Sequence, residues 1–288
     1  MNKKLHPLIS ERLKKIKPRS SDEALHVAKE IVQEIALLGL MRAGFFKKAA
    51  FHGGTAFRIF YGLDRFSEDL DFCLQKPDKK YELSSFLEPI KNEIESWGLT
   101  VEVTERKKLD EVVKKAFLKE TSLGALLSLQ TPVDPNQKLL IKLEIDTNPS
   151  AGATFESKLC EFPTDFYVLC HDLNSMFAGK LHAVLKRKYI KGRDWYDLLV
   201  YLTRRVQPNY SLLKNALLQS DKDQDLPNQL DLQWLEKALK ERIECVDLDK
   251  AKDDAAPFVT EGSSINLWSK KLFLDKLNNY ATELRIKN

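Results

Sequence analysis

Apolar residues recur at helical spacing over residues 20–40, where SSDEALHVAKEIVQEIALLGL begins with the Ser and Asp residues preferred at helix N-termini. Beyond it, KKAAFHGG predicts a short strand that ends at a glycine turn, and TAFRIFYG predicts a helix of about two turns. SEDLDFCL alternates polar and apolar residues and predicts a second strand. DKKYELSSFLEPIKNEIESWG predicts a helix that one proline interrupts.

Three further strand-like patterns follow: LTVEVTE, LGALLSLQ and KLLIKLEID. From His171 onward the pattern is helical, with DLNSMFAGKLHAVLKRKYI, DWYDLLVYLTRR and three or four more helices. This order predicts an α+β fold, in which a core with a mixed sheet precedes a helical domain. We expect a basic helical segment over residues 1–40, the α+β core over 41–165 and the helical domain over 166–288.

Charge is distributed unevenly along the 288 residues, whose formal net charge is +4. Residues 1–48 contain eleven Lys and Arg against five acidic residues, which suits a polyanionic partner but is also typical of a solvated surface. The four cysteines form no Cys-x-x-Cys pair, so neither a disulfide framework nor a zinc site is indicated. The longest apolar stretch is too short to span a bilayer. These features predict a cytoplasmic protein without a membrane partner.

Two carboxylates lie on one face of the strand predicted for SEDLDFCL. Asp69 and Asp71 are two residues apart, so both side chains point to the same side, with backbones roughly 7 Å apart. At a side-chain separation of about 5 Å and an effective dielectric constant near 20, their repulsion is about 3 kcal/mol. A cation is therefore expected beside them.

Metal-dependent phosphoryl chemistry needs oxygen ligands for Mg²⁺ and backbone donors that approach a phosphate closely. Gly53 and Gly54 precede Thr55, where a helix would begin and could present N–H groups to an anion. The strand at 139–146 offers a third carboxylate, from Glu144 or Asp146. Each signal alone has an ordinary explanation: a glycine pair forms turns, and Asp-x-Asp occurs on solvated strand faces.

The order of these motifs resembles the polymerase-β-like nucleotidyltransferase superfamily and, more closely, its AbiEii/AbiGii-type toxins. GGTAFRIFYGLDRFSEDLDF at 53–72 is similar to that family's GGTALR…YGLxRxSxDLDF. KLHAVLKRKYIKGRDWYDL at 180–198 is similar to its second block, KLHALLxRxxxKxRDxYDL. The resemblance spans about residues 40–205 and implies a polymerase-β-like core.

The resemblance also implies roles for individual residues. The residues that would bind the nucleotide are those of the glycine turn, two further residues of the first block and the first lysine of the second block: Gly53, Gly54, Thr55, Arg65, Ser67 and Lys180. Asp69 and Asp71 would bind Mg²⁺ or Mn²⁺, together with Glu144, the favoured third acid, or Asp146. Lys180 and Asp194 would act in catalysis beside Asp69, Asp71 and Glu144. An isolated Asp194 would instead be interpreted as a helix N-cap.

Four cations in the second block are too many for one triphosphate: Lys186, Arg187, Lys188 and Lys191. We expect them to bind the acceptor, although cations at a solvated helix end are also common. The resemblance implies a magnesium-dependent toxin of a toxin–antitoxin or phage-defence system, with a separately encoded antitoxin. It would transfer a nucleoside monophosphate from an NTP to an acceptor, which for some relatives is the tRNA 3′ end. The alternatives are a transferase for small molecules or proteins, and a non-enzymatic nucleotide-binding regulator.

Overall fold

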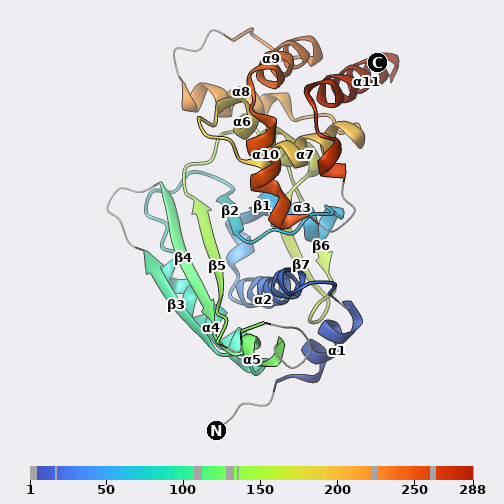
Figure 1. Ribbon diagram of the computed structural model, residues 1–288. Coiled ribbons are helices and arrows are strands. Elements are labelled where there is room, and N and C mark those ends of the chain that lie inside the picture. The colour runs from blue at the N-terminus through green and yellow to red at the C-terminus, as the bar shows by residue number, and fades with distance from the viewer. Residues whose placement is uncertain are drawn as a thin grey trace. The chain divides into compact units, whose positions relative to one another are not determined.

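The computed structural model (Figure 1) describes residues 5–16, 18–106, 112–127, 133–134, 136–221, 226–259 and 264–287. The chain divides into two compact units. The first comprises residues 1–60, 66–149 and 156–170, and the second comprises 61–65, 150–155 and 171–288. Residues 61–65 therefore belong to the second unit, although their neighbours on both sides in sequence belong to the first. The expected boundaries near residues 40 and 165 stay a prediction.

The first unit contains a mixed seven-stranded sheet with the order β3-β4-β5-β2-β1-β7-β6. The strands are β1 (Ala49–His52), β2 (Leu70–Leu74), β3 (Val101–Arg106), β4 (Val113–Glu120), β5 (Leu139–Asp146), β6 (Phe155–Cys160) and β7 (Phe166–His171). β2 pairs with β1 in antiparallel and with β5 in parallel orientation. The two central strands that carry the sequence motifs, β2 and β5, are therefore direct neighbours.

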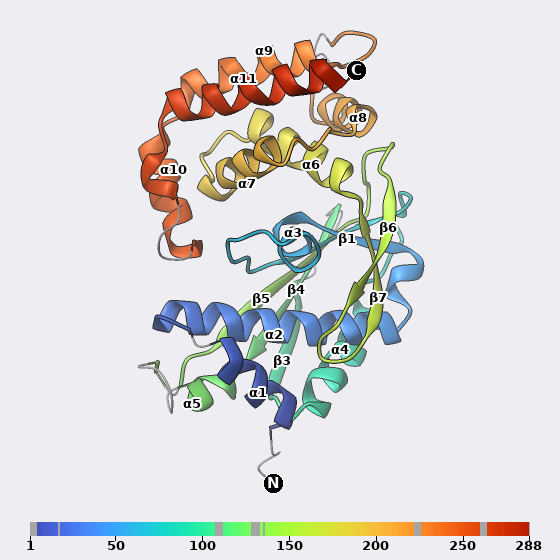
Figure 2. The ribbon, with the colours of Figure 1, turned by 90° about the vertical axis from the view of Figure 1, so that its right-hand side faces the viewer.

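Helix α2 (Ser21–Arg42) is the longest helix of the first unit and is buried along most of its length. Its N-cap is Ser20, whose side chain accepts a hydrogen bond from the backbone N–H of Glu23. α2 packs against β5 and against α4 (Ser84–Ser96), as Figure 2 shows. Helix α1 (Pro7–Ile16) packs on α2. This layer covers the sheet at β5, through α2, and at β3, through α4.

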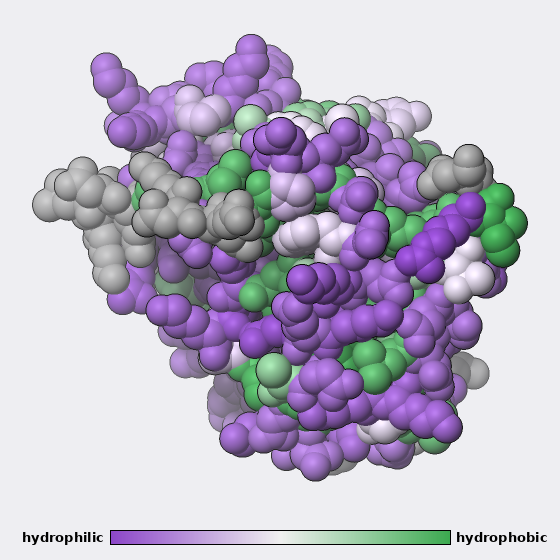
Figure 3. Space-filling view, turned by 90° about the horizontal axis from the view of Figure 1, so that it is seen from above, coloured by the Kyte–Doolittle hydropathy of each residue, from purple (hydrophilic) through white to green (hydrophobic). Residues whose placement is uncertain are grey.

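The second unit consists mainly of helices. They are α6 (Leu173–Lys186), α7 (Gly192–Thr203), α8 (Tyr210–Ser220), α9 (Leu232–Cys245), α10 (Leu248–Ala255) and α11 (Lys270–Lys287). α7 contacts α6, α10 and α11, while α9 and α11 lie side by side (Figure 2). At the start of α7, a Cβ on Gly192 would lie 1.8 Å from the carbonyl oxygen of Ala251, so only glycine fits there. The face drawn in Figure 3 is mainly hydrophilic.

The structure confirms the predicted α+β class, with helices dominating after His171. One predicted strand was wrong: Leu123–Leu127 forms helix α5, and the rest of LGALLSLQ lies outside the described residues. The cause is the buried carboxylate of Glu120, which accepts hydrogen bonds from the N–H groups of Ser122 and Leu123 and so starts a helical turn. α4 begins six residues later than its pattern suggested, after a turn in which Asp78 Oδ1 accepts from Lys80 N.

Candidate active site

The glycine turn between β1 and α3 (Gly53–Tyr61) lies directly against Asp71. Gly53 has a φ of +78°, a conformation that favours glycine. A Cβ there would stand 2.6 Å from Oδ2 of Asp71, so the missing side chain makes room for this carboxylate. Thr55 is buried, and its Oγ1 donates a 2.5 Å hydrogen bond to the carbonyl oxygen of Asp69. The turn, the first residues of α3 and both aspartates thus form one local structure.

Strand register places the third acid. Asp71 of β2 lies beside His52 of β1 on one side and beside Glu144 of β5 on the other. Asp146 lies beside Cys73, two residues farther along β2, and its Oδ1 accepts a hydrogen bond from the N–H of Asn148. Of the two acids that sequence spacing left open, Glu144 is therefore the neighbour of Asp71.

The cation expected from the sequence is Lys142. Its Nζ lies 2.8 Å from Oε2 of Glu144, and Lys115 Nζ lies 3.2 Å from Oε1 of the same carboxylate. Burial alone would lower the pKa of Lys142, but the hydrogen bond to Glu144 and the charges of Asp69 and Asp71 outweigh it and raise the pKa. Burial would likewise raise the pKa of Glu144, yet Lys142 and Lys115 hold it below its usual value. These three acids and two lysines thus partly neutralise one another.

Among the residues that the structure describes, no group of three or more His, Cys, Asp or Glu side chains is arranged as a metal site. Asp69 and Asp71 nevertheless supply carboxylate oxygens, which are hard donors. The Asp71 carboxylate packs directly against Gly53, so no side chain at position 53 separates it from the glycine turn. Mg²⁺ is usually bound by one or two carboxylates together with substrate phosphates and water rather than by a protein cage. The donor set therefore fits a magnesium ion that arrives with a nucleotide.

In the second unit, Lys180 of α6 lies between two carboxylates of α7. Its Nζ is 2.7 Å from Oδ1 of Asp194 and 2.8 Å from Oδ2 of Asp197. Burial would lower the pKa of Lys180, but the two aspartates outweigh it and hold the pKa above its usual value. Lys180 is therefore a fully charged ammonium in a mostly buried position.

Asp194 is not the N-cap of its helix, because α7 begins at Gly192 with Lys191 as its N-cap residue. Its buried carboxylate contacts Lys180, and its Oδ2 lies 3.2 Å from Nη1 of Arg187. Sequence reasoning missed Asp197, which is fully buried. The signal that could have found it is its spacing: an acid three residues after Asp194 lies on the same face of the helix.

Two residues of the first motif block occupy different places. Arg65 is buried and donates to Asp197 through Nε at 2.7 Å and Nη2 at 2.6 Å. Ser67 belongs to the first unit, where its carbonyl oxygen accepts from Nε2 of Gln33. The nucleotide-binding roles expected for Arg65 and Ser67 stay predictions.

The four cations expected to bind the acceptor differ in their surroundings. Lys188 is exposed, and Lys186 Nζ lies 3.5 Å from Asp221 Oδ2. Arg187 forms an ion pair with Asp194 and also lies over the ring of Tyr189. The guanidinium carbon of Arg187 is 5.0 Å from the centroid of that ring. Burial and the neighbouring Arg193 lower the pKa of Lys191. The cluster is thus a region of excess positive charge in which Arg187 already has a carboxylate partner.

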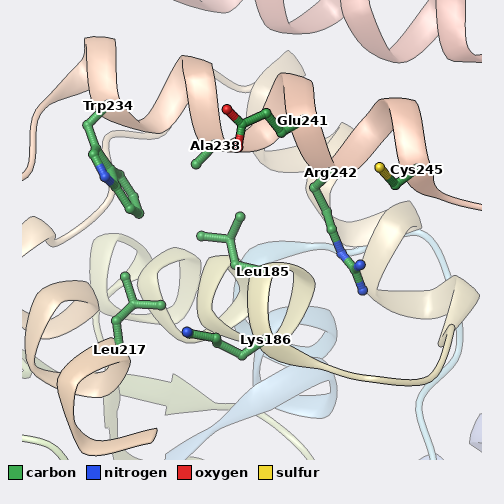
Figure 4. Close-up of a pocket in the computed structure, with 8 residues that line it drawn as sticks. All are labelled: Leu185, Lys186, Leu217, Trp234, Ala238, Glu241, Arg242 and Cys245. Carbon is green, nitrogen blue, oxygen red and sulfur yellow. The ribbon is translucent and has the colours of Figure 1, made fainter. Parts of the chain in front are cut away.

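A separate pocket of about 260 Å³ lies among α6, α8 and α9 (Figure 4). Trp234, Leu217 and Leu185 form its apolar part. Arg242, at its rim, donates to the carbonyl oxygens of Val184 and Arg187 and so caps the C-terminal end of α6. The pocket contains none of the acids discussed above, and Arg242 serves the structure of α6.

Comparison with known proteins identifies the class of enzyme: the protein is a nucleotidyltransferase. The model of a family described as nucleotidyl transferase AbiEii toxin, type IV TA system, matches residues 35–276, so the chain belongs to this family of toxin–antitoxin toxins. The family implies a nucleoside triphosphate substrate and an antitoxin partner. This confirms the family resemblance inferred from the two sequence blocks.

Two solved structures are similar to the chain. A candidate nucleotidyltransferase from H. pylori has 21% sequence identity and a TM-score of 0.49, covering 88% of this chain and 96% of its own. JHP933 from Helicobacter pylori has 20% identity and a TM-score of 0.48, covering 88% of this chain and 93% of its own. Among curated protein sequences, no significant match is found. Within the described part of the chain, no helix is both long and apolar enough to cross a membrane.

Proposed function

We propose that the protein transfers a nucleoside monophosphate from an NTP to the 3′ end of tRNA, with Mg²⁺ or Mn²⁺ as cofactor, as a cytoplasmic toxin in phage defence. The observation that carries this proposal is the contact between the glycine turn and strand β2: Asp71 packs over Gly53 and lies beside Glu144. This places carboxylates next to a helix N-terminus, where a phosphate is favoured. Both are needed to hold a metal-bound triphosphate.

Asp69 and Asp71 would hold the metal ions, with Glu144 as the third acid. The metal would supply charge neutralisation at the phosphates and activation of the acceptor oxygen. The N-terminal turn of α3, at Gly53 and Gly54, would hold phosphate oxygens through backbone N–H groups. Lys142 and Lys115 would keep Glu144 ionised and in place, because both bind its carboxylate.

The ion-pair cluster around the two carboxylates of α7 would bind the negative charge of the triphosphate through Lys180. It contains three cations, Lys180, Arg187 and Arg65, against the carboxylates Asp194 and Asp197. One positive charge is therefore left over within this group. Lys180 would donate to the triphosphate, and Asp194 would fix its ammonium and act as the late catalytic acid.

An RNA acceptor is favoured over a small molecule because nearby lysines lie outside the ion-pair cluster of Lys180, Asp194 and Asp197. Lys188 is exposed and Lys186 reaches only a 3.5 Å contact, so both could meet a phosphate backbone. The basic excess in residues 1–48 points to the same class of acceptor. A small-molecule or protein hydroxyl remains the alternative acceptor, and a nucleotide-binding regulator without turnover remains the alternative function.

The deciding experiment incubates the protein with each α-³²P-labelled NTP, Mg²⁺, and either total RNA or total protein. Label in the tRNA fraction, lost in the Asp71→Asn variant, is the expected result. Label in protein or in a small molecule would refute the tRNA acceptor while keeping the enzyme class. Specific nucleotide binding without transfer to any fraction would favour the regulator. Omitting Mg²⁺ and adding Mn²⁺ tests the cofactor in the same assay.

A further inference from the structure

We infer that Arg65 and Asp197 form a buried positioning pair that holds the ammonium of Lys180 in place for a phosphate, and that neither of them touches the nucleotide. The inference rests on the proposed role of Lys180 in nucleotide use. It changes the role that the sequence motif suggested for Arg65 and assigns one to Asp197, which sequence reasoning did not single out.

The geometry separates these two residues from any ligand. Asp197 is fully buried, and Arg65 is 2% exposed. Both carboxylate oxygens of Asp197 are engaged by the guanidinium fork of Arg65, at 2.7 and 2.6 Å, and Oδ2 also receives Lys180 Nζ at 2.8 Å. A bidentate arginine fixes the plane of a carboxylate. Arg65 therefore fixes Asp197, and Asp197 fixes Lys180.

Lys180 is the member of the network with a donor to spare. An ammonium has three N–H donors, and the two aspartates accept two of them. Lys180 is also 15% exposed, whereas Arg65 and Asp197 are almost wholly enclosed. The third N–H is the one that can donate to a phosphate, and its direction is set by the two carboxylates.

A purely structural role for Arg65 is the competing explanation. Arg65 lies in the segment 61–65, and its ion pair would hold this segment on α7. The segment already has other contacts with the helical unit: Arg204 donates to the carbonyl oxygens of Tyr61 and Gly62, and Tyr61 Oη donates to the carbonyl oxygen of His171. Arg204→Gln is therefore a control that weakens the same segment without touching Lys180.

The test variant is the double substitution Arg65→Gln with Asp197→Asn. Asp197→Asn alone would remove the carboxylate that binds the buried guanidinium of Arg65, whereas the double variant replaces the ion pair with neutral, hydrogen-bonding amides. The reactivity of Lys180 is measured by competitive acetylation with mass spectrometry across pH, and KM and kcat are measured for the NTP. The charged groups around Lys180 are Asp194, Asp197 and Arg65, with Arg187 and Lys191 nearby, and only the pair is changed.

We expect Lys180 to titrate at lower pH in the double variant, and KM for the NTP to rise about tenfold or more while kcat changes less. Arg204→Gln should leave the titration and KM unchanged. Unchanged Lys180 titration and KM in the folded double variant would overturn the inference. If the double variant does not fold, Asp197→Glu keeps the charge but moves the carboxylate, and an unchanged KM there would overturn it equally.

The two proposals fail in different ways. If Lys180→Ala retains normal NTP kinetics, the proposed role of Lys180 in nucleotide use is wrong. The acetylation experiment needs no turnover, so it still reports whether Arg65 and Asp197 hold the ammonium.

Discussion

Gly53 and Asp71 are so close that any side chain at position 53 would overlap the carboxylate: its Cβ would lie 2.6 Å from Oδ2 and 3.1 Å from Cβ of Asp71. Gly53→Ala must therefore move Asp71 as well as strain a backbone with φ +78°. We expect the variant to lose about 2–4 kcal/mol of unfolding free energy and most of its transfer activity. Urea unfolding and the labelled-NTP assay measure the two effects.

Gly62 is the matched control for this substitution. Its φ is +62°, but a Cβ there would meet nothing within 4 Å. Gly62→Ala should thus cost only the backbone strain, about 1–2 kcal/mol, and leave transfer nearly unchanged. Equal loss of activity in both alanine variants would mean that backbone strain, and not the crowding of Asp71, accounts for the effect.

The two aspartates themselves give the second prediction. Asp69→Asn and Asp71→Asn should each lower magnesium-dependent transfer by about 100-fold or more, because each removes a proposed metal ligand. The melting temperature without metal should stay the same or rise slightly, since each change removes one of two neighbouring like charges. Transfer at the wild-type rate in either variant would eliminate that aspartate as a ligand.

Sequence patterns predicted the parts of this site that are local in the chain. The glycine turn, strand β2 with Asp71, and helix α2 follow from periodicity and turn chemistry over stretches of fewer than about 25 residues. Asp69, which the alternation placed in the strand, lies directly before it. A cation beside the aspartates was also expected from Coulomb's law, although the sequence could not identify it as Lys142. That identity depends on the register of β2 against β5, which joins residues about 70 positions apart.

The parts that sequence patterns missed depend on tertiary contacts. Asp197 looks like any surface acid on an amphipathic helix, and only the folded chain shows it bound to Arg65, 132 residues away in sequence. Similarly, the apolar stretch at 123–127 reads equally well as strand or helix, and the Glu120 carboxylate decides for a helix. Strand β4 was missed because its consecutive Lys114 and Lys115 interrupt the alternation.

The choice between Glu144 and Asp146 is the third prediction. Glu144 lies beside Asp71, whereas Asp146 lies beside Cys73 and accepts the N–H of Asn148. We expect Glu144→Gln to lower transfer by about 10–100-fold, and Asp146→Asn to change it by no more than about threefold. Steady-state kinetics at saturating Mg²⁺ compare the two. A larger loss for Asp146→Asn would assign the third acid to Asp146.

Glu34 gives a prediction about stability and pH. It is buried in α2, where Arg12 Nη2 lies 2.7 Å from its Oε2 and where Glu30 and Arg58 are also near. Burial outweighs the attraction of Arg12 and raises the pKa of Glu34 from 4.5 to about 8. Between these pKa values the native chain keeps a proton that the unfolded chain loses, so the contribution of Glu34 to stability is greatest below the unfolded pKa and falls as pH rises towards 8.

Glu34→Gln removes this titration. The free energy of unfolding of the variant, relative to that of the wild type, should increase between about pH 5 and pH 8 by a few kcal/mol. Urea unfolding at several pH values measures the difference. A difference that is independent of pH would show that Glu34 is ionised in the native state throughout this range.

The last prediction concerns the acceptor. Lys186, Lys188 and Lys191 can be neutralised without breaking the Arg187–Asp194 ion pair, so their triple alanine variant changes the basic surface and leaves the buried cluster in place. If the acceptor is RNA, its affinity should fall by roughly ten- to a thousandfold, and the slope of log K against log salt should flatten by about two to three. Binding of NTP without acceptor should change far less.

The control replaces three exposed lysines elsewhere in the helical unit, Lys237, Lys250 and Lys271, and so removes the same net charge. Long-range attraction to RNA should weaken slightly in this control, but the slope should change by less than about one, because lysines away from the contact release few counterions. Equal flattening in both variants would show that overall charge, and not a binding surface, governs RNA affinity. Loss of NTP binding in the Lys186/Lys188/Lys191 variant would place these lysines at the triphosphate. If the acceptor is a small molecule, the lysine substitutions should leave the affinity for the acceptor and the affinity for NTP nearly unchanged, because a small molecule has no extended phosphate backbone to neutralise.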